Sequence, residues 1–77
     1  MDEMKISYGV FSKAYANAYD PDPQWELFSG WYDRYDIARQ MLEYAKRNIR
    51  CAELKIAKRT ETHEDVSGTL WKREAQP

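Results

Sequence analysis

The sequence contains few of the residues and segments that small proteins use for disulfide bonds, catalysis or membrane insertion. Its 77 residues include one cysteine, one histidine and three glycines. The single cysteine, Cys51, excludes an internal disulfide, which is the usual staple of a small secreted domain. The glycines are too scattered to form a phosphate-binding loop. No apolar run approaches the ~20 residues that a membrane-spanning helix requires.

These absences, together with the acidic start Met1-Asp2-Glu3, which lacks the charge of a secretory signal, predict a cytoplasmic location and no membrane contact. His63 stands beside acids in an expected turn, without further ligands at metal-binding spacing. Asp20 and Asp22 flank prolines and are explained by turn formation. We therefore expect no enzyme activity, no catalytic residue, no metal site and no cofactor.

The length and the 43% apolar content indicate one globular domain over residues 1–77, with a frayed tail at 74–77. Alternation of apolar and polar residues predicts four strands. Their ranges are 4–11, 24–32, 51–62 and 69–73. The Asp-Pro-Asp-Pro run at 20–23 predicts a stiff loop and residues 63–68 a turn, while residues 12–19 fit neither a strand nor a helix clearly.

A helix is predicted between the second and third strands. Asp33 is a suitable N-cap, and apolar residues follow at the spacing of one helical face up to Ile49. The apolar set is Ile37, Ala38, Met41, Leu42, Ala45 and Ile49. The order β-β-α-β-β predicts an α+β fold: a mostly antiparallel four-stranded sheet with one amphipathic helix packed on one face.

The aromatic content exceeds what one helix can cover, since the chain has three Trp, six Tyr and two Phe. Beneath the helix we expect Ile6, Tyr8, Val10, Trp25, Leu27, Trp31, Leu54, Ile56 and Leu70. On the other face we expect Phe11, Phe28, Tyr32 and Trp71, together with Lys55 and Arg59. That face could be closed by the loop at 12–24, be buried by a protein partner or a second copy, or stack nucleic-acid bases.

Positive charge is concentrated in the middle of the chain. Residues 34–59 carry eight basic and three acidic residues, although the net charge of the chain is −1. The outer side of the helix and the second sheet face together define the predicted binding surface. Its residues are Phe28, Tyr32, Lys55, Arg59 and Trp71 from the sheet and Arg39, Lys46, Arg47 and Arg50 from the helix flank.

The stretch from Tyr32 to Thr62 runs from a capped amphipathic helix into Ala52-Glu-Leu-Lys-Ile-Ala-Lys-Arg-Thr60. In this pattern, and in its β-β-α-β-β order, the chain resembles small phage-encoded proteins of the anti-CRISPR and host-takeover type. The resemblance covers about half of the chain. It implies action without catalysis, by occupying the surface of a host protein or of a protein–nucleic-acid complex.

The expected function is therefore a non-enzymatic protein-binding module, in particular an anti-CRISPR-like phage or mobile-element inhibitor that blocks a host complex. A homodimer is compatible with this function. The alternative is a small RNA- or single-stranded-DNA-binding domain that uses an aromatic and basic sheet face. The slightly negative net charge and the missing RNA-recognition signature weigh against direct nucleic-acid binding. Replacing Trp71 by alanine is expected to weaken partner binding more than folding.

Overall fold

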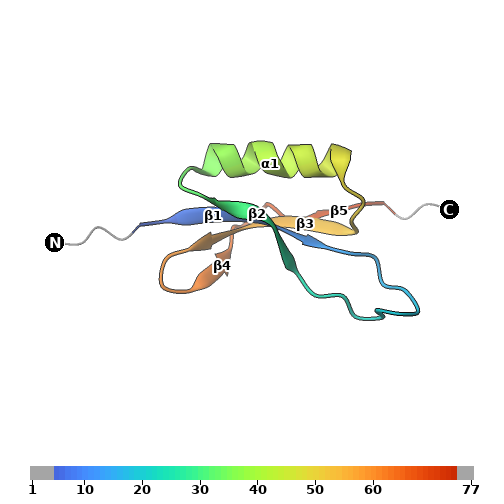
Figure 1. Cartoon of the computed structure of the whole chain (residues 1–77). Helices are drawn as coiled ribbons and strands as arrows, with labels where there is room; N and C mark the ends of the chain where they lie inside the picture. The colour runs from blue at the N-terminus through green and yellow to red at the C-terminus, as the bar shows by residue number, and fades with distance from the viewer. Residues whose placement is uncertain (1–4, 75–77) are drawn as a thin grey trace.

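One helix lies across one face of an antiparallel sheet in the computed structural model, which describes residues 5–74 (Figure 1). The elements are β1 (Ser7–Lys13), β2 (Glu26–Tyr32), α1 (Tyr35–Asn48), β3 (Glu53–Arg59), β4 (His63–Asp65) and β5 (Trp71–Lys72). The predicted α+β class is confirmed. Apart from Glu74, the predicted frayed tail lies outside the described residues, as does Met4 of the first predicted strand.

The sheet has the strand order β2-β1-β3-β4, and β5 also pairs with β3. β1 and β3 pair along their full lengths, from Ser7 opposite Arg59 to Lys13 opposite Glu53. The short strands β4 and β5 pair with opposite ends of β3 and so share one edge of the sheet. The predicted turn at 63–68 is therefore wrong for residues 63–65, which pair with β3.

Charged cross-strand pairs stabilise β4, a strand with no apolar side chain. Lys58 lies 3.6 Å from Glu64, and the Lys55 ammonium lies 3.0 Å from a carboxylate oxygen of Asp65. Opposite charges facing each other across a ladder each contribute a few tenths of a kcal/mol to about 1 kcal/mol. Hydrophobic alternation alone does not detect such a strand.

The N-cap of the helix lies one residue later than predicted. Arg34, not Asp33, occupies the N-cap position, and no side chain accepts a hydrogen bond there. Arg34 instead donates two hydrogen bonds to the carboxylate of Asp36, at 3.0 and 2.9 Å. That carboxylate lies in the first turn, where negative charge complements the helix dipole.

The core forms where α1 meets the two central strands. Ala38, Leu42 and Ala45 are buried on the predicted apolar face of the helix, and Met41 and Ile49 pack at its margins. Val10, Leu54 and Ile56 are buried on the sheet side, together with Cys51. The two alanines lack bulk, which allows the helix backbone to approach the sheet closely.

The face of β2 that carries Leu27 and Trp31 points away from the helix, opposite to the prediction. Val10 belongs to the core, so the side chain of its neighbour Gly9 would point to the other face. A Cβ atom built on Gly9 lies 2.9 Å from Leu27 Cδ1 and 2.9 Å from Trp31 Cε3. Leu27 and Trp31 therefore cover the face opposite α1.

Three aromatics predicted for that far face lie on the helix side instead. Phe28, Tyr32 and Trp71 pack, partly buried, against the core. Trp71 also pairs with Leu54, whose side chain is fully buried beneath the helix. The prediction placed Ile6 and Leu70 in the core, but they are 41% and 56% exposed. The predictions for Tyr8, Val10, Leu54 and Ile56 are confirmed.

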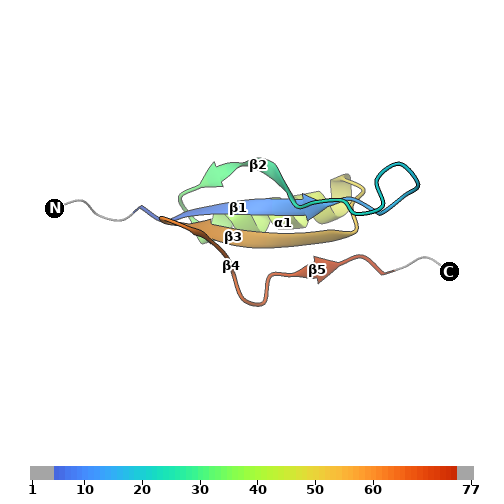
Figure 2. The same cartoon turned by 90° about the horizontal axis from the view of Figure 1, so that it is seen from below.

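The loop between β1 and β2 projects beyond the end of the sheet (Figure 2). Residues 14–22 are exposed, and Tyr19 is 99% exposed. The Asn17 side chain organises this loop, because its carbonyl oxygen accepts hydrogen bonds from the amides of Tyr19 and Asp20. The loop thus does not fold over the sheet as a second layer; only Trp25, at its end, returns to the face opposite the helix.

Candidate functional site

The face of the sheet opposite α1, here called the open face, is an aromatic and basic surface. No helix or loop of residues 5–74 forms a layer over it (Figure 2). Strand alternation places its side chains, because the neighbours of core residues in β1 and β3 must point away from the helix. The open face comprises Phe11, Lys13, Trp25, Leu27, Trp31, Glu53, Lys55, Ala57, Arg59, His63, Asp65 and Lys72.

Trp31 is at the centre of an aromatic cluster on the open face. Its ring contacts Phe11 edge-on at 5.7 Å between centroids and His63 at 5.0 Å. The guanidinium of Arg59 lies over the same ring at 4.3 Å from its centroid. Gly9, beneath, has no side chain and so leaves the space that Trp31 and Leu27 fill.

Trp25 forms the second half of the open face. The ammonium of Lys55 lies 4.3 Å from its ring centroid, and that of Lys13 lies at 5.6 Å. The Lys55 side chain is only 16% exposed because Trp25 and Asp65 enclose it. A shallow cavity of about 110 Å³ lies between Phe11, Trp25 and His63.

The charges of the open face are partly compensated. Lys55 pairs with Asp65 at 3.0 Å, and Lys13 lies 3.9 Å from Glu53. Among the described residues, Arg59 forms no ion pair. The surface therefore presents large rings and a small excess of positive charge, because Lys13 and Lys72 share the Glu53 carboxylate and Arg59 has no carboxylate partner among residues 5–74.

The structure separates the residues of the predicted binding surface into three groups. Lys55 and Arg59 lie on the open face, whereas Phe28, Tyr32 and Trp71 lie on the helix side and line no part of it. Lys46, Arg47 and Arg50 meet at the end of α1, while Arg39 lies farther back along the helix. Trp25 and Trp31 were predicted to lie in the core, whereas both are half-buried rings on the open face. Gly9 was the signal, because a glycine in a central strand indicates that a large group covers it.

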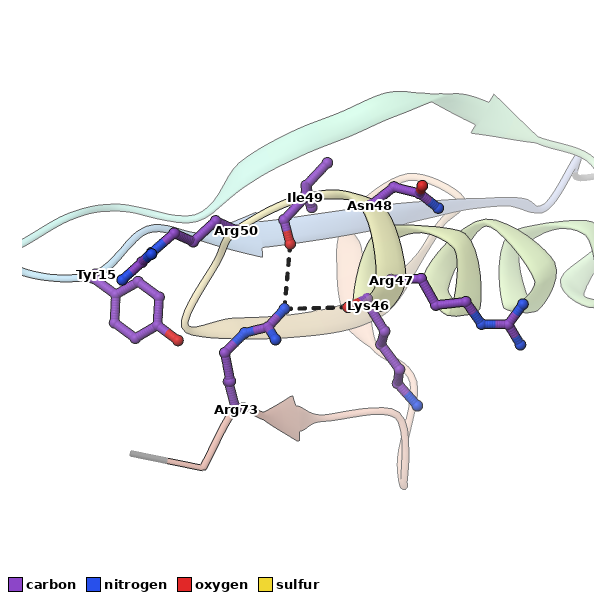
Figure 3. Close-up of a pocket in the computed structure, with 7 residues that line it drawn as sticks. All are labelled: Tyr15, Lys46, Arg47, Asn48, Ile49, Arg50 and Arg73. Atoms are coloured by element: carbon purple, nitrogen blue, oxygen red, sulfur yellow. Dashed lines mark hydrogen bonds between the residues drawn. The ribbon is translucent and has the colours of Figure 1, made fainter. Parts of the chain in front are cut away.

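The second basic surface is a pocket at the end of α1, here called the basic pocket (Figure 3). It has a volume of about 540 Å³, and none of its lining residues is acidic. The lining residues are Tyr15, Lys46, Arg47, Asn48, Ile49, Arg50 and Arg73. Arg73 was not among the predicted binding residues, since it lies 23 residues beyond Arg50 in the sequence and only the fold brings them together.

Arg73 closes the C-terminal end of the helix. Its Nε donates to the carbonyl oxygen of Cys51 at 3.0 Å, and one terminal nitrogen, Nη2, donates to those of Lys46 and Ile49 at 3.2 Å each. Two of these acceptors belong to the last carbonyls of α1, which lack partners within the helix. The guanidinium is therefore held in one orientation at the floor of the basic pocket.

The remaining chemistry-bearing groups of residues 5–74 form no site. Cys51 is buried, and burial raises the pKa of its thiol although Arg73 opposes this effect. A buried neutral thiol is a poor nucleophile. No three metal-ligating side chains of the described residues come together. The described helix is too short and too polar to cross a membrane.

Comparison of the chain with protein-family models, with curated proteins and with solved structures found no significant match. The geometry of the two surfaces is therefore the ground for assigning a function.

Proposed function

We propose that this chain is a non-enzymatic protein-binding module that buries its open face against a partner protein. The observation that carries the proposal is the position of Trp25 and Trp31, which lie outside the core on a sheet face that no second layer covers. Tryptophan, tyrosine and arginine dominate the energetics of protein interfaces. Aromatic rings held in place by neighbouring cations also lose little side-chain entropy on binding.

Charge compensation on the open face favours a protein over a nucleic acid. Three of its four cations lie near carboxylates on the same face: Lys55 pairs with Asp65, and Lys13 and Lys72 share Glu53. Binding to phosphates requires cations that are free to replace counterions. Arg59 meets this requirement most fully, whereas a mixed aromatic and partly compensated surface is typical of the centre of a protein interface.

The resemblance of residues 32–62 to host-takeover proteins supplies the class of partner. We propose a host protein complex that handles nucleic acid, blocked by surface occupation in the manner of an anti-CRISPR protein. A second copy of the chain is the other protein that fits the same face. Both partners would cover Trp25 and Trp31.

The test is affinity capture of the partner from host lysate with the wild-type chain and with a Trp31→Ser variant, both treated with nuclease. Removing a ring at the centre of an interface costs about 2 kcal/mol or more, which is about 30-fold in affinity. We expect capture to survive nuclease and to be lost with Trp31→Ser. Tyr19→Ser is the matched control, because Tyr19 is a fully exposed aromatic away from the open face.

Equal capture by the wild type and by Trp31→Ser, with both chains folded, would contradict the proposal. Sedimentation of the purified chain tests the second copy. A dimer that dissociates in Trp31→Ser but not in Tyr19→Ser would identify the chain itself as the partner.

Single-stranded nucleic acid is the second candidate, because the rings of the open face alternate with cations in the way that suits base stacking. The test is a fluorescence titration of labelled oligonucleotides at several salt concentrations. Affinity that falls steeply with salt, and that requires Trp25 and Trp31, would favour this candidate. Absence of binding at low salt excludes it.

A further inference from the structure

We infer that the basic pocket at the end of α1 is a binding site for a phosphoryl group, separate from the open face. The pocket combines cationic side chains from three segments of the chain: the helix end, the residues after it and Arg73, which follows the last strand. A phosphoryl group is a tetrahedral dianion that accepts hydrogen bonds from several directions. Donors from separate segments of the chain, here Tyr15, Arg50 and Arg73, fit this shape better than they fit a planar carboxylate.

The floor of the basic pocket is preorganised. Arg73 uses Nε and Nη2 to hold three carbonyl oxygens, and its other terminal nitrogen, Nη1, donates to no described residue. The Trp71 ring lies against the same guanidinium, 5.0 Å away, and against the Lys46 ammonium at 5.7 Å. The Arg73 guanidinium is thus positioned before any ligand arrives, whereas the Lys46 ammonium is also held by the Glu43 carboxylate at 2.8 Å.

The partial negative charge at the C-terminal end of the helix does not prevent anions from binding in the basic pocket. The C-terminal end of a helix carries partial negative charge on its last carbonyl groups. Here Arg73 covers the carbonyls of Lys46 and Ile49, and the amide of Ile49 covers that of Ala45. Of the four cations that line the pocket, Lys46 is paired with Glu43 at 2.8 Å, so Arg50 and Arg73 supply the positive charge that no carboxylate of the described residues neutralises within the pocket.

The walls of the pocket supply further donors. Arg50 stacks on Tyr15 with its guanidinium 5.7 Å from the ring centroid, and Figure 3 shows the Tyr15 hydroxyl directed toward Arg73. Neither Arg47 nor Arg50 forms an ion pair with a carboxylate of the described residues. In Figure 3 the Arg47 side chain points away from the other cations, so it adds to the positive electrostatic potential but would not contact a ligand in the pocket.

The experiment is an NMR titration of the whole chain with inorganic pyrophosphate, at constant ionic strength maintained with sodium chloride. We expect saturable shifts of the Tyr15, Arg50 and Arg73 amides. Arg50→Ala should weaken binding about tenfold, and Tyr15→Phe about two- to fivefold. Arg73 is left unchanged because its loss would also uncap the helix.

Arg39→Ala is the control, since it removes one positive charge from the exposed side of α1 outside the pocket. We expect it to leave pyrophosphate binding unchanged. Shifts that do not saturate, or an equal loss of affinity in Arg39→Ala and Arg50→Ala, would overturn the inference and leave only general attraction between charges.

A nucleoside diphosphate and a short oligothymidylate distinguish the source of the phosphoryl group. Tighter binding of the oligonucleotide, with the same dependence on Arg50, would identify a nucleic-acid backbone. Tighter binding of the nucleoside diphosphate would identify a free nucleotide. Binding of either that is insensitive to Arg50→Ala would place the ligand elsewhere and contradict the inference.

Discussion

Replacing Gly9 by alanine tests the placement of Trp31 and Leu27 on the open face. The added Cβ would lie 2.9 Å from Leu27 Cδ1 and 2.9 Å from Trp31 Cε3, closer than carbon atoms normally pack. Gly9 is itself buried beneath these two side chains. One of them must therefore move, and the Trp31 ring is restrained by Phe11 and by Arg59.

The expected cost combines two opposing effects. Overpacking a well-filled site costs about 1–3 kcal/mol. Replacing glycine by alanine in a strand recovers about 0.5–1 kcal/mol of backbone entropy. Because Leu27 has a flexible and partly exposed end that can yield, we expect Gly9→Ala to destabilise the fold by about 1–2 kcal/mol. In a chain of this size that lowers the melting temperature by about 4–16 °C.

The two other glycines provide matched controls in the same protein. A Cβ on Gly30 meets nothing within 4 Å, so Gly30→Ala should be neutral or stabilising by up to about 1 kcal/mol. Gly68 also has open space, but its φ of 81° is strained for any residue with a side chain. Gly68→Ala should therefore cost about 1 kcal/mol through the backbone alone.

Urea unfolding of the three variants measures these differences. Trimming Leu27 to alanine in the Gly9→Ala background should recover part of the lost stability, because it removes one of the two clashes. A Gly9→Ala variant as stable as Gly30→Ala would refute the reasoning, since Gly9 would then have no ring above it.

Three further changes test the helix side of the molecule, each read by urea unfolding unless stated. Trp71→Ala should lower the free energy of unfolding by about 2–4 kcal/mol and leave association unchanged, because the ring packs on the core. Weakened association with unchanged stability would show instead that Trp71 is a surface residue. Thr69→Val should cost about 1–3 kcal/mol because it leaves the buried amide of Ile56 unpaired, whereas Thr69→Ser should cost much less; equal effects would contradict this role. The hydrogen bond from Lys46 lowers the pKa of Glu43 below its ordinary value of 4.5, so its contribution to stability is present above that pH and is lost as the pH falls through the lowered pKa. Glu43→Gln should flatten the acid side of the curve of melting temperature against pH, and an unchanged curve would show that the pair does not contribute.

Most of the fold could be predicted from periodicity. The apolar spacing from Ala38 to Ile49 identifies the helix, and alternation in β1 and β3 identifies both the strands and the residues that face it. Strand β4 could not be found in this way because its pairing relies on charged side chains. The N-cap was misplaced because Asp33 had a suitable side chain but lies one residue too early.

The sequence predicts that one sheet face is aromatic and basic, but it does not identify which residues form that face. Alternation correctly separated Leu27 and Trp31 from Phe28 and Tyr32, but it does not say which set faces the helix. The pairing advances two residues in β1, from Gly9 to Phe11, while it advances four in β2, from Leu27 to Trp31. β2 thus contains two more residues than β1 between these paired positions. Because side chains alternate with a period of two, the two extra residues leave both Leu27 and Trp31 on the open face.

The full set of residues that line the basic pocket could not be predicted from the sequence, because tertiary contacts bring them together. Lys46, Arg47 and Arg50 were predictable as a helix flank. Arg73 was not, because its position follows from the pairing of β5 with the beginning of β3. A cation contributed from a distant segment leaves no signal in local spacing.

Hydroxyl-radical footprinting of the captured complex tests most directly whether the open face is the surface that binds. We expect Trp25, Trp31 and Phe11 to lose reactivity when the partner is bound, while Tyr44 on the helix keeps the reactivity it has in the free chain. Protection of Tyr44, with Trp25 and Trp31 still as reactive as before, would show that the partner sits on the helix and would contradict the account.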